Sequence, residues 1–506
     1  MGLPLAVSPT VLGPGLYITV DLLAAVATPG SQPLKAVIMS PRSTAGNLTV
    51  DTEIRRAGSM DDGSTAFGIG SPGHLALQRF LEKNPNAVVD MIAPTASAGV
   101  SATGTITFTG GPVTGAAYNV LITICGRQIN VPWNVGEVLA DIQARAVAFI
   151  NQQSKNLPVT ASAGGAGVVT LTFKVPGPWG NDVLFSAVLQ NGTGGNVAVS
   201  NSGQFTGGTT EPDFTTALNT ISGTQYDFIL LCVSNADADS SSATSNPGRA
   251  KTKVNSLNTG LLAKLQRVYL GATGALSAAK TGAIGRNDPV FEFPMCINGQ
   301  GLPCELGATE MGDAMASVAI DPAANRIGNT LENFFGSANL VADTPTGANI
   351  EDALGNGVSI VSYNAQGTPI IVRPISTHSQ DSGGNPDRRA FDMSGTHGMY
   401  AVGNDIKVAL PTRFPKAKLS KNLAADADPL PAGVVEERDI LAFLVERLRF
   451  WQAKGVVRKD LLDLAIANGT IIVQVDGTDS TQVDIVIPLG IFPPLAKFGV
   501  YMQKVA

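Results

Sequence analysis

AFGIGSPGHLALQRFLEKNPNAVVDMIAP (residues 66–94) combines the signals of a helix and of a buried strand. Apolar residues recur at helical spacing within residues 73–84, and residues 87–94 form a largely apolar run typical of a covered strand. A similar run, LKAVIMS, precedes them at residues 34–40. The run YDFILLCVS at residues 226–234 predicts a further strand buried on both faces. Alternation of such strands with helices predicts an α/β sheet.

The same stretch contains a G-x-G-x-x-G pattern at Gly68, Gly70 and Gly73, which is the signature of dinucleotide binding. That chemistry requires the glycines to follow a strand directly, so that the pyrophosphate meets the N-terminus of the helix. The preceding residues, SMDDGSTAF, do not resemble a strand, and Pro72 lies inside the motif. We therefore predict a tight turn that leads into a helix, and no cofactor.

Composition limits the possible function classes. The chain has 506 residues, of which 44% are hydrophobic and only 15% are charged, and its net charge of −6 opposes nucleic-acid binding. A surface poor in charge is consistent with burial between subunits of a large assembly. The N-terminal residues lack the features of a signal peptide, and no apolar run reaches the length of a membrane span. The four scattered cysteines are expected to be reduced and buried, with no zinc site.

Changes in composition along the chain predict a multidomain α/β (α+β) protein. Residues 97–208 are rich in Gly, Thr, Ser and Val and contain several alternating runs, so they are predicted to form a mainly β domain inserted into the α/β body. The predicted units are an N-terminal arm (1–30), the body (31–96 and 209–345), the inserted domain (97–208), a C-terminal α/β domain (346–496) and a C-terminal arm (497–506).

Three polar segments are candidates for catalytic or metal sites. QDSGG (380–384) resembles the nucleophile segment of serine proteases, but no suitable upstream histidine and aspartate accompany it. Residues 377–397 gather two histidines and three aspartates, and NADADSSS (235–242) follows a predicted parallel strand, where ligands often bind. No spacing forces these groups together. We predict loops and no catalytic residue, and leave open whether either of the last two binds an ion.

Both ends of the chain carry an isolated β-type run tethered by Pro or Gly. An unpaired strand exposes backbone donors and acceptors, so it pairs with its own domain or with a neighbouring chain. If both runs pair with neighbours, the contacts are heterologous and build rings or helical polymers. The candidate arm residues are Leu16, Tyr17, Ile18, Thr19 and Val20 at the N-terminus, and Phe498, Gly499, Val500, Tyr501 and Met502 at the C-terminus.

Several segments, taken in order, resemble the contractile tail sheath proteins of bacteriophages, particularly the Mu-like type. The resemblance rests on GPGLYITV near the N-terminus, the FGIGS turn before a helix that ends in NP, PGPWGND (176–182), AIDPAANRIGNTLE, TRFPKAKLSKN and the closing β-type run. It covers the whole length of the chain. The long β insertion departs from compact sheath proteins.

The resemblance implies a structural protein without enzymatic activity. Such subunits polymerise as stacked hexameric rings around a tail tube, exchange terminal strands with neighbours, and contract to drive the tube through the bacterial envelope for genome delivery. The implied partners are further copies of the chain, the tail tube protein, and the baseplate and tail terminator proteins, with no nucleic acid and no membrane. The implied location is the virion tail, assembled in the host cytoplasm. The alternatives are an α/β enzyme with an appended β binding domain, and a secreted adhesin, which the missing signal peptide opposes.

The resemblance also implies that the C-terminal domain faces the tube, while the insertion faces outward. Residues 434–455 are predicted to form the strongest helix of the chain. A basic group on and after this helix is the candidate docking surface, because weak charged contacts suit an interface with the tube that has to dissociate. Its members are Arg447, Arg449, Lys454, Arg458 and Lys459. The alternative is a solvated helix face with ion pairs to Glu436, Glu437 and Glu446.

Overall fold

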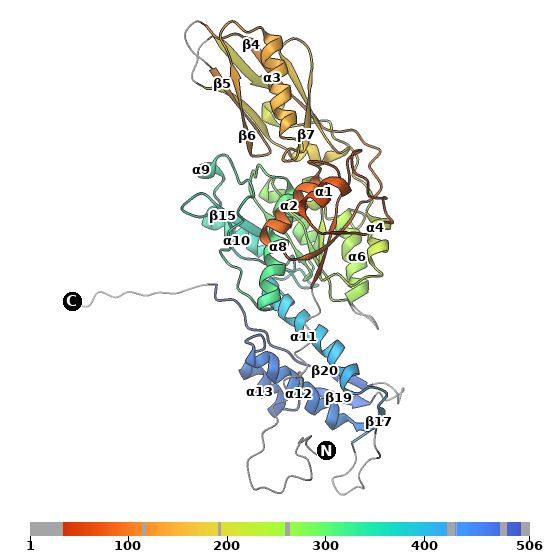
Figure 1. Ribbon diagram of the computed structural model, residues 1–506. Helices are drawn as coiled ribbons and strands as arrows, with labels where there is room; N and C mark the ends of the chain where they lie inside the picture. The colour runs from red at the N-terminus through yellow and green to blue at the C-terminus, as the bar shows by residue number, and fades with distance from the viewer. Residues whose placement is uncertain are drawn as a thin grey trace, which may run out of the picture.

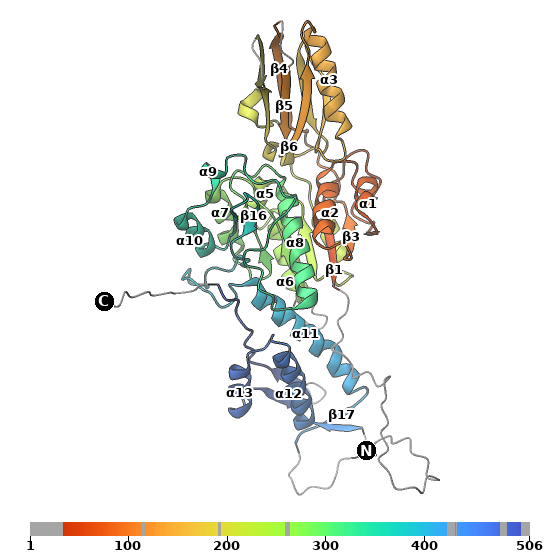
Figure 2. The same cartoon turned by 60° about the vertical axis from the view of Figure 1, so that its left-hand side comes forward.

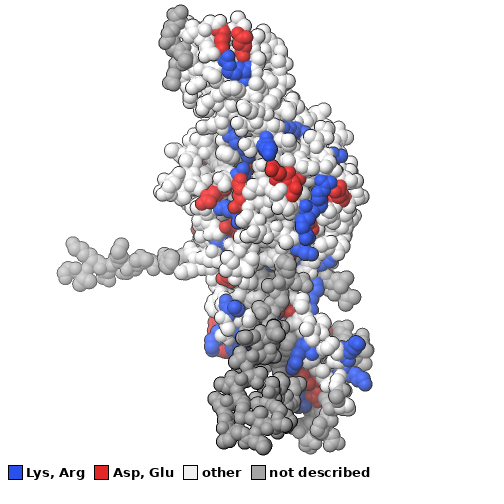
Figure 3. All heavy atoms as spheres, viewed as in Figure 1, with Lys and Arg blue, Asp and Glu red and all other residues white. Residues whose placement is uncertain are grey.

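The computed structural model describes residues 34–113, 118–190, 194–258, 264–422, 431, 433–475 and 483–496. These residues form a multidomain α/β (α+β) protein. Figure 1 shows a central body, with the inserted unit (residues 97–208) at one end and the C-terminal unit at the other. On the face shown in Figure 3, most of the described surface belongs to residues other than Lys, Arg, Asp and Glu. No helix in the described ranges is long and apolar enough to cross a membrane.

The body is built on a six-stranded sheet in the order β13-β12-β11-β1-β3-β2. Neighbouring strands are parallel except β2, which runs antiparallel to β3. β11 is buried at every residue, as its continuous apolar sequence predicts. The strands are β1 (Lys35–Met39), β2 (Arg55–Ala57), β3 (Val88–Ile92), β11 (Phe228–Leu231), β12 (Arg267–Tyr269) and β13 (Phe291–Glu292).

Helices cover both faces of this sheet. On one face α2 (Pro72–Lys83) packs against α8 (Pro303–Ile320), and their apolar residues join those of the sheet in one core. α2 begins where expected, because Ser71 accepts a hydrogen bond from the backbone N–H of His74 and Pro72 occupies its first turn. The other face is covered by α4 (Thr215–Ile221), α6 (Asn246–Asn258) and α7 (Leu276–Arg286). Two short helices, α1 (Met60–Ala66) and α5 (Asn235–Ala238), complete this part.

A small second sheet lies beside the first. β15 (Ser359–Tyr363) pairs in parallel with β14 (Pro294–Met295) and forms a hairpin with β16 (Pro369–Ile371). Val358 and Ile360 pack into the core of the central sheet. The structure therefore joins residues near 360 to the body, and the boundary expected at residue 345 falls inside a packed region. The helices α9 (Leu340–Asp343) and α10 (Gly347–Gly355) precede β15.

The inserted unit contains a four-stranded sheet, β10-β4-β8-β7, and a three-stranded sheet, β6-β5-β9, with α3 (Leu139–Gln152) packed against them. Alternating side chains of β4 and β8 point into its core, where Phe108 meets Trp133 edge to face at 5.6 Å. The strands are β4 (Thr103–Gly110), β5 (Tyr118–Ile124), β6 (Arg127–Trp133), β7 (Val159–Ala163), β8 (Val168–Phe173), β9 (Phe185–Gln190) and β10 (Gly195–Val199), with 3-10 turns η1 (Pro178–Asp182) and η2 (Ser200–Gly203).

The helix α11 (Met393–Arg413) connects the C-terminal unit to the body, and it runs from the body into that unit in both views (Figures 1 and 2). The unit contains α12 (Glu437–Ala453) and α13 (Lys459–Ala467). Two small sheets accompany them, β17 (Lys418–Ser420) with β18 (Val434–Glu436), and β19 (Ile472–Val475) with β20 (Val483–Val486). The helix predicted to start at residue 434 starts at Glu437, because residues 434–436 pair as β18.

Candidate functional site

The C-terminal unit is positioned by α11, whose two halves belong to different cores. At its start His397 is buried 5.9 Å from the ring of Phe228, and burial lowers the pKa of this histidine well below its usual value. Further along, Val402 joins the core of the C-terminal unit. One helix therefore links the body to the unit that the sequence analysis assigns to tube docking.

Asp405 of α11 and Arg447 of α12 form a buried ion pair in this unit. The Arg447 Nε donates to Asp405 Oδ2 at 3.0 Å, and the Trp451 indole N–H donates to the same oxygen at 2.9 Å. The side chain of Asp405 is only 3% exposed and that of Arg447 only 13%. Arg447 therefore joins two helices and does not extend into solvent.

The other candidate docking cations lie nearer the surface. Arg449 and Lys459 both pair with Asp463, each at 2.5 Å, and Arg458 pairs with Asp460 at 2.6 Å. Lys459 and Arg449 hold the pKa of Asp463 below its usual value, as Arg458 does for Asp460.

Lys454 lies over the ring of Phe450, 5.7 Å from its centre. The ion pairs found for four of these cations are with aspartates, in place of the alternative partners Glu436, Glu437 and Glu446. Arg447 and Arg449 reach Asp405 and Asp463 through the packing of helices, which spacing within one helix does not reveal. Arg458–Asp460 and Lys459–Asp463 are local pairs at the start of and within α13.

The sheet formed by β19 and β20 is the second notable feature of this unit. Within the described ranges it consists of these two strands alone, paired antiparallel with Ile472 opposite Val486. Both side chains are exposed, by 42% and 54%. A two-stranded sheet is marginally stable alone, and its outer edges can accept further strands.

Both predicted arms, Leu16–Val20 and Phe498–Met502, lie outside the described residues. The structure therefore leaves their pairing as a prediction.

The glycine pattern forms a turn between two helices. α1, a helix and not a strand, precedes it, and Gly68 and Gly70 adopt φ of +93° and +70°, a region that glycine enters without steric cost. Gly73 lies inside α2 where its backbone contacts Phe67, and an added Cβ would come within 2.6 Å of that ring. These glycines meet the needs of backbone conformation and packing.

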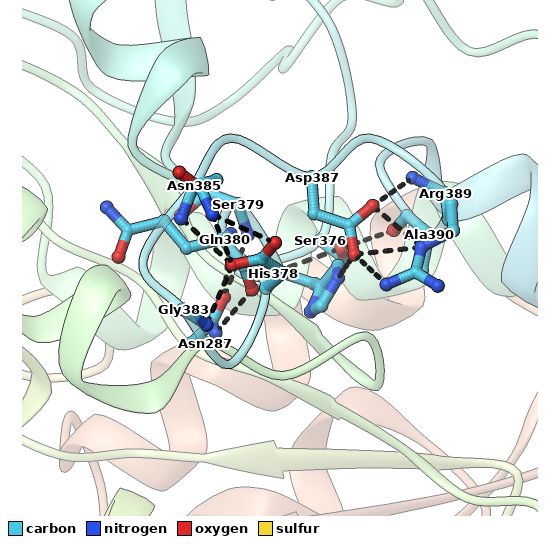
Figure 4. A network of polar contacts seen from close by, with 11 residues as sticks. Asn287, Ser376, His378, Ser379, Gln380, Gly383, Asn385, Asp387, Arg389 and Ala390 are labelled. Atoms are coloured by element: carbon cyan, nitrogen blue, oxygen red, sulfur yellow. Dashed lines mark hydrogen bonds and ion pairs between the residues drawn. The ribbon is translucent and has the colours of Figure 1, made fainter.

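The polar segment 377–397 is a loop followed by the start of α11, and it does not bring its two histidines to one site. His378 contacts Asp387 at 2.9 Å, and Arg389 holds that carboxylate from the other side (Figure 4). The side-chain oxygen of Asn287 accepts hydrogen bonds from the backbone N–H groups of Ser379 and Gln380. His397 is buried in the body instead.

The segment 235–242 begins with the short helix α5, where the Asn235 side chain bonds to Thr273. No group of three His, Cys, Asp or Glu side chains suited to a metal ion occurs in the described part of the chain. All four cysteines are free and buried, as predicted.

Sequence reasoning missed the buried ionic network around α8. Arg127 of the inserted unit donates to Glu305 at 2.5 Å, and Arg79 of α2 lies 3.5 Å from the same carboxylate. A cavity of about 560 Å³ opens beside these arginines, between the inserted unit and the body. Two glutamates inside the largely apolar sequence of α8 are the feature of the sequence that indicates a buried ionic network. Their partners are distant in the chain, so the sequence does not identify them.

Comparison with known proteins found no matching family model and no matching curated protein. Solved structures similar to this chain include a sheath tail protein of Listeria innocua (12% identity, 84% of this chain and 86% of that one, TM-score 0.42). A sheath tail protein of Desulfitobacterium hafniense is also similar (11%, 95% and 100%, TM-score 0.46), as is a chain of the anti-feeding prophage baseplate (10%, 98% and 99%, TM-score 0.44).

Proposed function

We propose that this chain is a structural subunit of a contractile tail sheath, of the Mu-like type, without enzymatic activity. The observation that carries the proposal is the two-stranded β19–β20 sheet of the C-terminal unit, whose outer strand edges pair with no further strand among the described residues. The chain itself supplies isolated β-type runs at both ends that such edges can accept. Because a subunit would give its arms to neighbours and receive theirs, the contact is heterologous and extends into rings and helices.

In this mechanism the arms keep subunits linked while the bodies exchange contacts. Hexameric rings stack around the tail tube in an extended, higher-energy lattice, and contraction to the lower-energy lattice drives the tube through the bacterial envelope for genome delivery. Such a change is a switch between two discrete packings of rigid units. The implied partners remain the tail tube, the baseplate and the tail terminator, in a virion tail assembled in the host cytoplasm.

The positions of the two outer units support a radial arrangement. The inserted unit and the C-terminal unit lie at opposite ends of the body in both views (Figures 1 and 2). If the C-terminal unit contacts the tube, the inserted unit lies on the outside of the sheath, where additional domains are tolerated.

Negative-stain electron microscopy of the purified chain tests the proposal. The full-length chain should form tubes, whereas a chain ending at residue 496 should not. Val500→Pro in the full-length chain should also prevent tubes, because proline cannot donate a ladder hydrogen bond, while the β-branched control Val500→Thr should form them. Discrete particles in all samples, or tubes in all, would contradict polymerisation through the C-terminal arm.

A further inference from the structure

The inserted unit contacts the body through one particular lysine. Lys174 follows β8, and its ammonium group donates to the backbone carbonyl of Ile69 in the body at 2.9 Å. The same Nζ reaches two backbone carbonyls of its own unit, Ser154 at 2.6 Å and Leu157 at 2.8 Å, and the Ser154 hydroxyl at 3.0 Å. An ammonium group has three donors, so these four oxygens satisfy it fully.

Ile69 lies between Gly68 and Gly70, so this contact falls on the glycine turn before α2. Gly70 is buried and has φ of +70°. A Cβ added to it would collide with the carbonyl oxygens of Ser154 and Leu157 and with Lys174 Nζ. Glycine is therefore needed here both for its backbone conformation and for the close approach of the inserted unit.

The turn is itself held rigidly. The backbone N–H of Gly70 donates to His74 Nδ1 at 2.9 Å, and the backbone N–H of His74 donates to Ser71 Oγ at 3.3 Å. The carbonyl of Ile69 is thus presented in a fixed direction at the start of α2.

We propose that Lys174 is a latch that fixes the inserted unit in one orientation on the body, and that the turn of Gly68, Ile69 and Gly70 is its socket. This inference concerns the chain alone and stands whether or not the protein is a tail sheath.

Other contacts across the same joint differ in strength. Lys155 pairs with Asp61 at 3.0 Å, but both side chains are more than 60% exposed, and such pairs contribute little. Two buried contacts also cross the joint: Arg127 pairs with Glu305, and Asp182 of the inserted unit accepts a hydrogen bond from the backbone N–H of Asn235 in the body at 2.8 Å. Two contacts leave rotation about the line that joins them possible, and Lys174 supplies the third contact that prevents it.

Removing the lysine has a physical cost that removing Lys155 lacks. Burial lowers the pKa of Lys174 to about 8, and no carboxylate of the described chain pairs with it, so its charge is stabilised by oxygen dipoles. Lys174→Met leaves the Ile69, Ser154 and Leu157 carbonyls without this donor. Lys155→Met is the matched control, because it removes a lysine from the same joint at an exposed position.

Distance measurement between spin labels tests the latch. Labels are placed at Ser162→Cys on β7 and Thr252→Cys on α6, both exposed positions, while the four native thiols are buried. The labelled full chain is diluted at least tenfold with unlabelled chain, so that distances within one subunit dominate. We expect one narrow distance distribution in the otherwise unchanged protein and in Lys155→Met, and a distribution at least twice as broad in Lys174→Met.

Gly70→Ala provides a second route to the same result, since it displaces the socket without altering the lysine. It should broaden the distribution, and combining it with Lys174→Met should add little, because both changes break one contact. Circular dichroism verifies that each variant is folded. A Lys174→Met or Gly70→Ala distribution as narrow as that of the unchanged protein, or a broad distribution in the unchanged protein, would overturn the proposal.

Discussion

The carboxylate of Asp405 in α11 accepts hydrogen bonds from the guanidinium group of Arg447 in α12, and this pair fastens the C-terminal unit to the helix that leaves the body. A second donor, the indole of Trp451, completes the site. By its place in the sequence, Arg447 belongs with the more exposed cations as a candidate for tube docking. Its partner in α11 gives it a role within the chain instead, so docking and stability have to be tested at different residues.

Asp405→Ala should destabilise the C-terminal unit by about 3–5 kcal/mol, because it leaves the Arg447 charge buried without its partner. Urea unfolding followed by tryptophan fluorescence measures this change, in a chain where Trp133 and Trp179 are replaced by Phe so that Trp451 alone reports. Asp463→Ala, which removes a surface partner of Arg449 and Lys459, is the control and should change the unfolding midpoint little. Equal midpoints for both variants would show that the Asp405 pair does not hold the unit together.

Reversal of the exposed cations tests tube docking. Arg458→Glu with Lys459→Glu should leave the chain folded and soluble, because these side chains are 37% and 68% exposed, but should abolish assembly on a tail tube. Lys155→Glu, on the inserted unit, is the same kind of charge reversal at a single exposed position and should assemble normally. Electron microscopy of sheath assembled with purified tubes gives the readout. Normal assembly of the double variant would remove the docking assignment.

Glu305→Gln should lower the free energy of unfolding by about 3 kcal/mol, since it leaves buried Arg127 without its counter-charge and Arg79 with Glu82 alone. Burial alone would raise the pKa of Glu305, but Arg127, Arg79 and the backbone N–H of Leu302 together outweigh it and hold the pKa below its usual value. The carboxylate therefore stabilises the fold above the unfolded-state pKa, and this contribution is lost as the pH falls. Glu332→Gln, at an exposed pair with Lys83, is the control for chemical denaturation. A loss no greater than that of the control would contradict the prediction.

His74 makes stability depend on pH in the acidic range. Burial, and then the nearby charge of Lys174, lower the pKa of His74 to about 4, so the unfolded chain binds a proton between pH 6.5 and 4 that the folded chain does not. Stability should fall by up to about 3 kcal/mol as the pH falls through this window. In His74→Asn the loss of stability that is due to His74 should be absent, while the carboxylates of the chain still titrate. Thermal unfolding of both chains at pH 7, 6, 5 and 4 measures the difference, and parallel curves would contradict it.

Asp182 should act in the opposite direction. Burial raises the pKa of this carboxyl to about 7, although the backbone N–H of Asn235, which it accepts at 2.8 Å, lowers it. The folded chain therefore holds a proton that the unfolded chain has already released above pH 4, and stability declines as the pH rises toward 7. Asp182→Asn keeps an acceptor for Asn235 without a charge. The difference in stability between this variant and the unchanged protein should favour the variant by about 2 kcal/mol more at pH 8 than at pH 5. Denaturant unfolding at the two pH values measures this, and a destabilised variant at pH 8 would refute it.

Periodicity and turn residues in the sequence were sufficient to predict several elements. β11 is recognisable because its continuous apolar run suits a strand covered on both faces, and the hairpin of β15 and β16 because a Gly-containing turn separates two β-type runs. α2 carries its own start signal in Ser71 and Pro72. These features depend on neighbouring residues, so one sequence displays them directly.

Only the tertiary structure determined the partners. The carbonyl of Ile69 accepts a hydrogen bond from Lys174, which lies 105 positions later in the chain. Arg447 donates to Asp405, which lies 42 positions earlier. Such contacts depend on which surfaces meet once apolar residues are buried, and side-chain charge alone does not specify them. The glycine pattern of residues 68–73 shows the difference: its sequence determined a turn before a helix, whereas the packing of a second unit against that turn determined what the glycines accommodate.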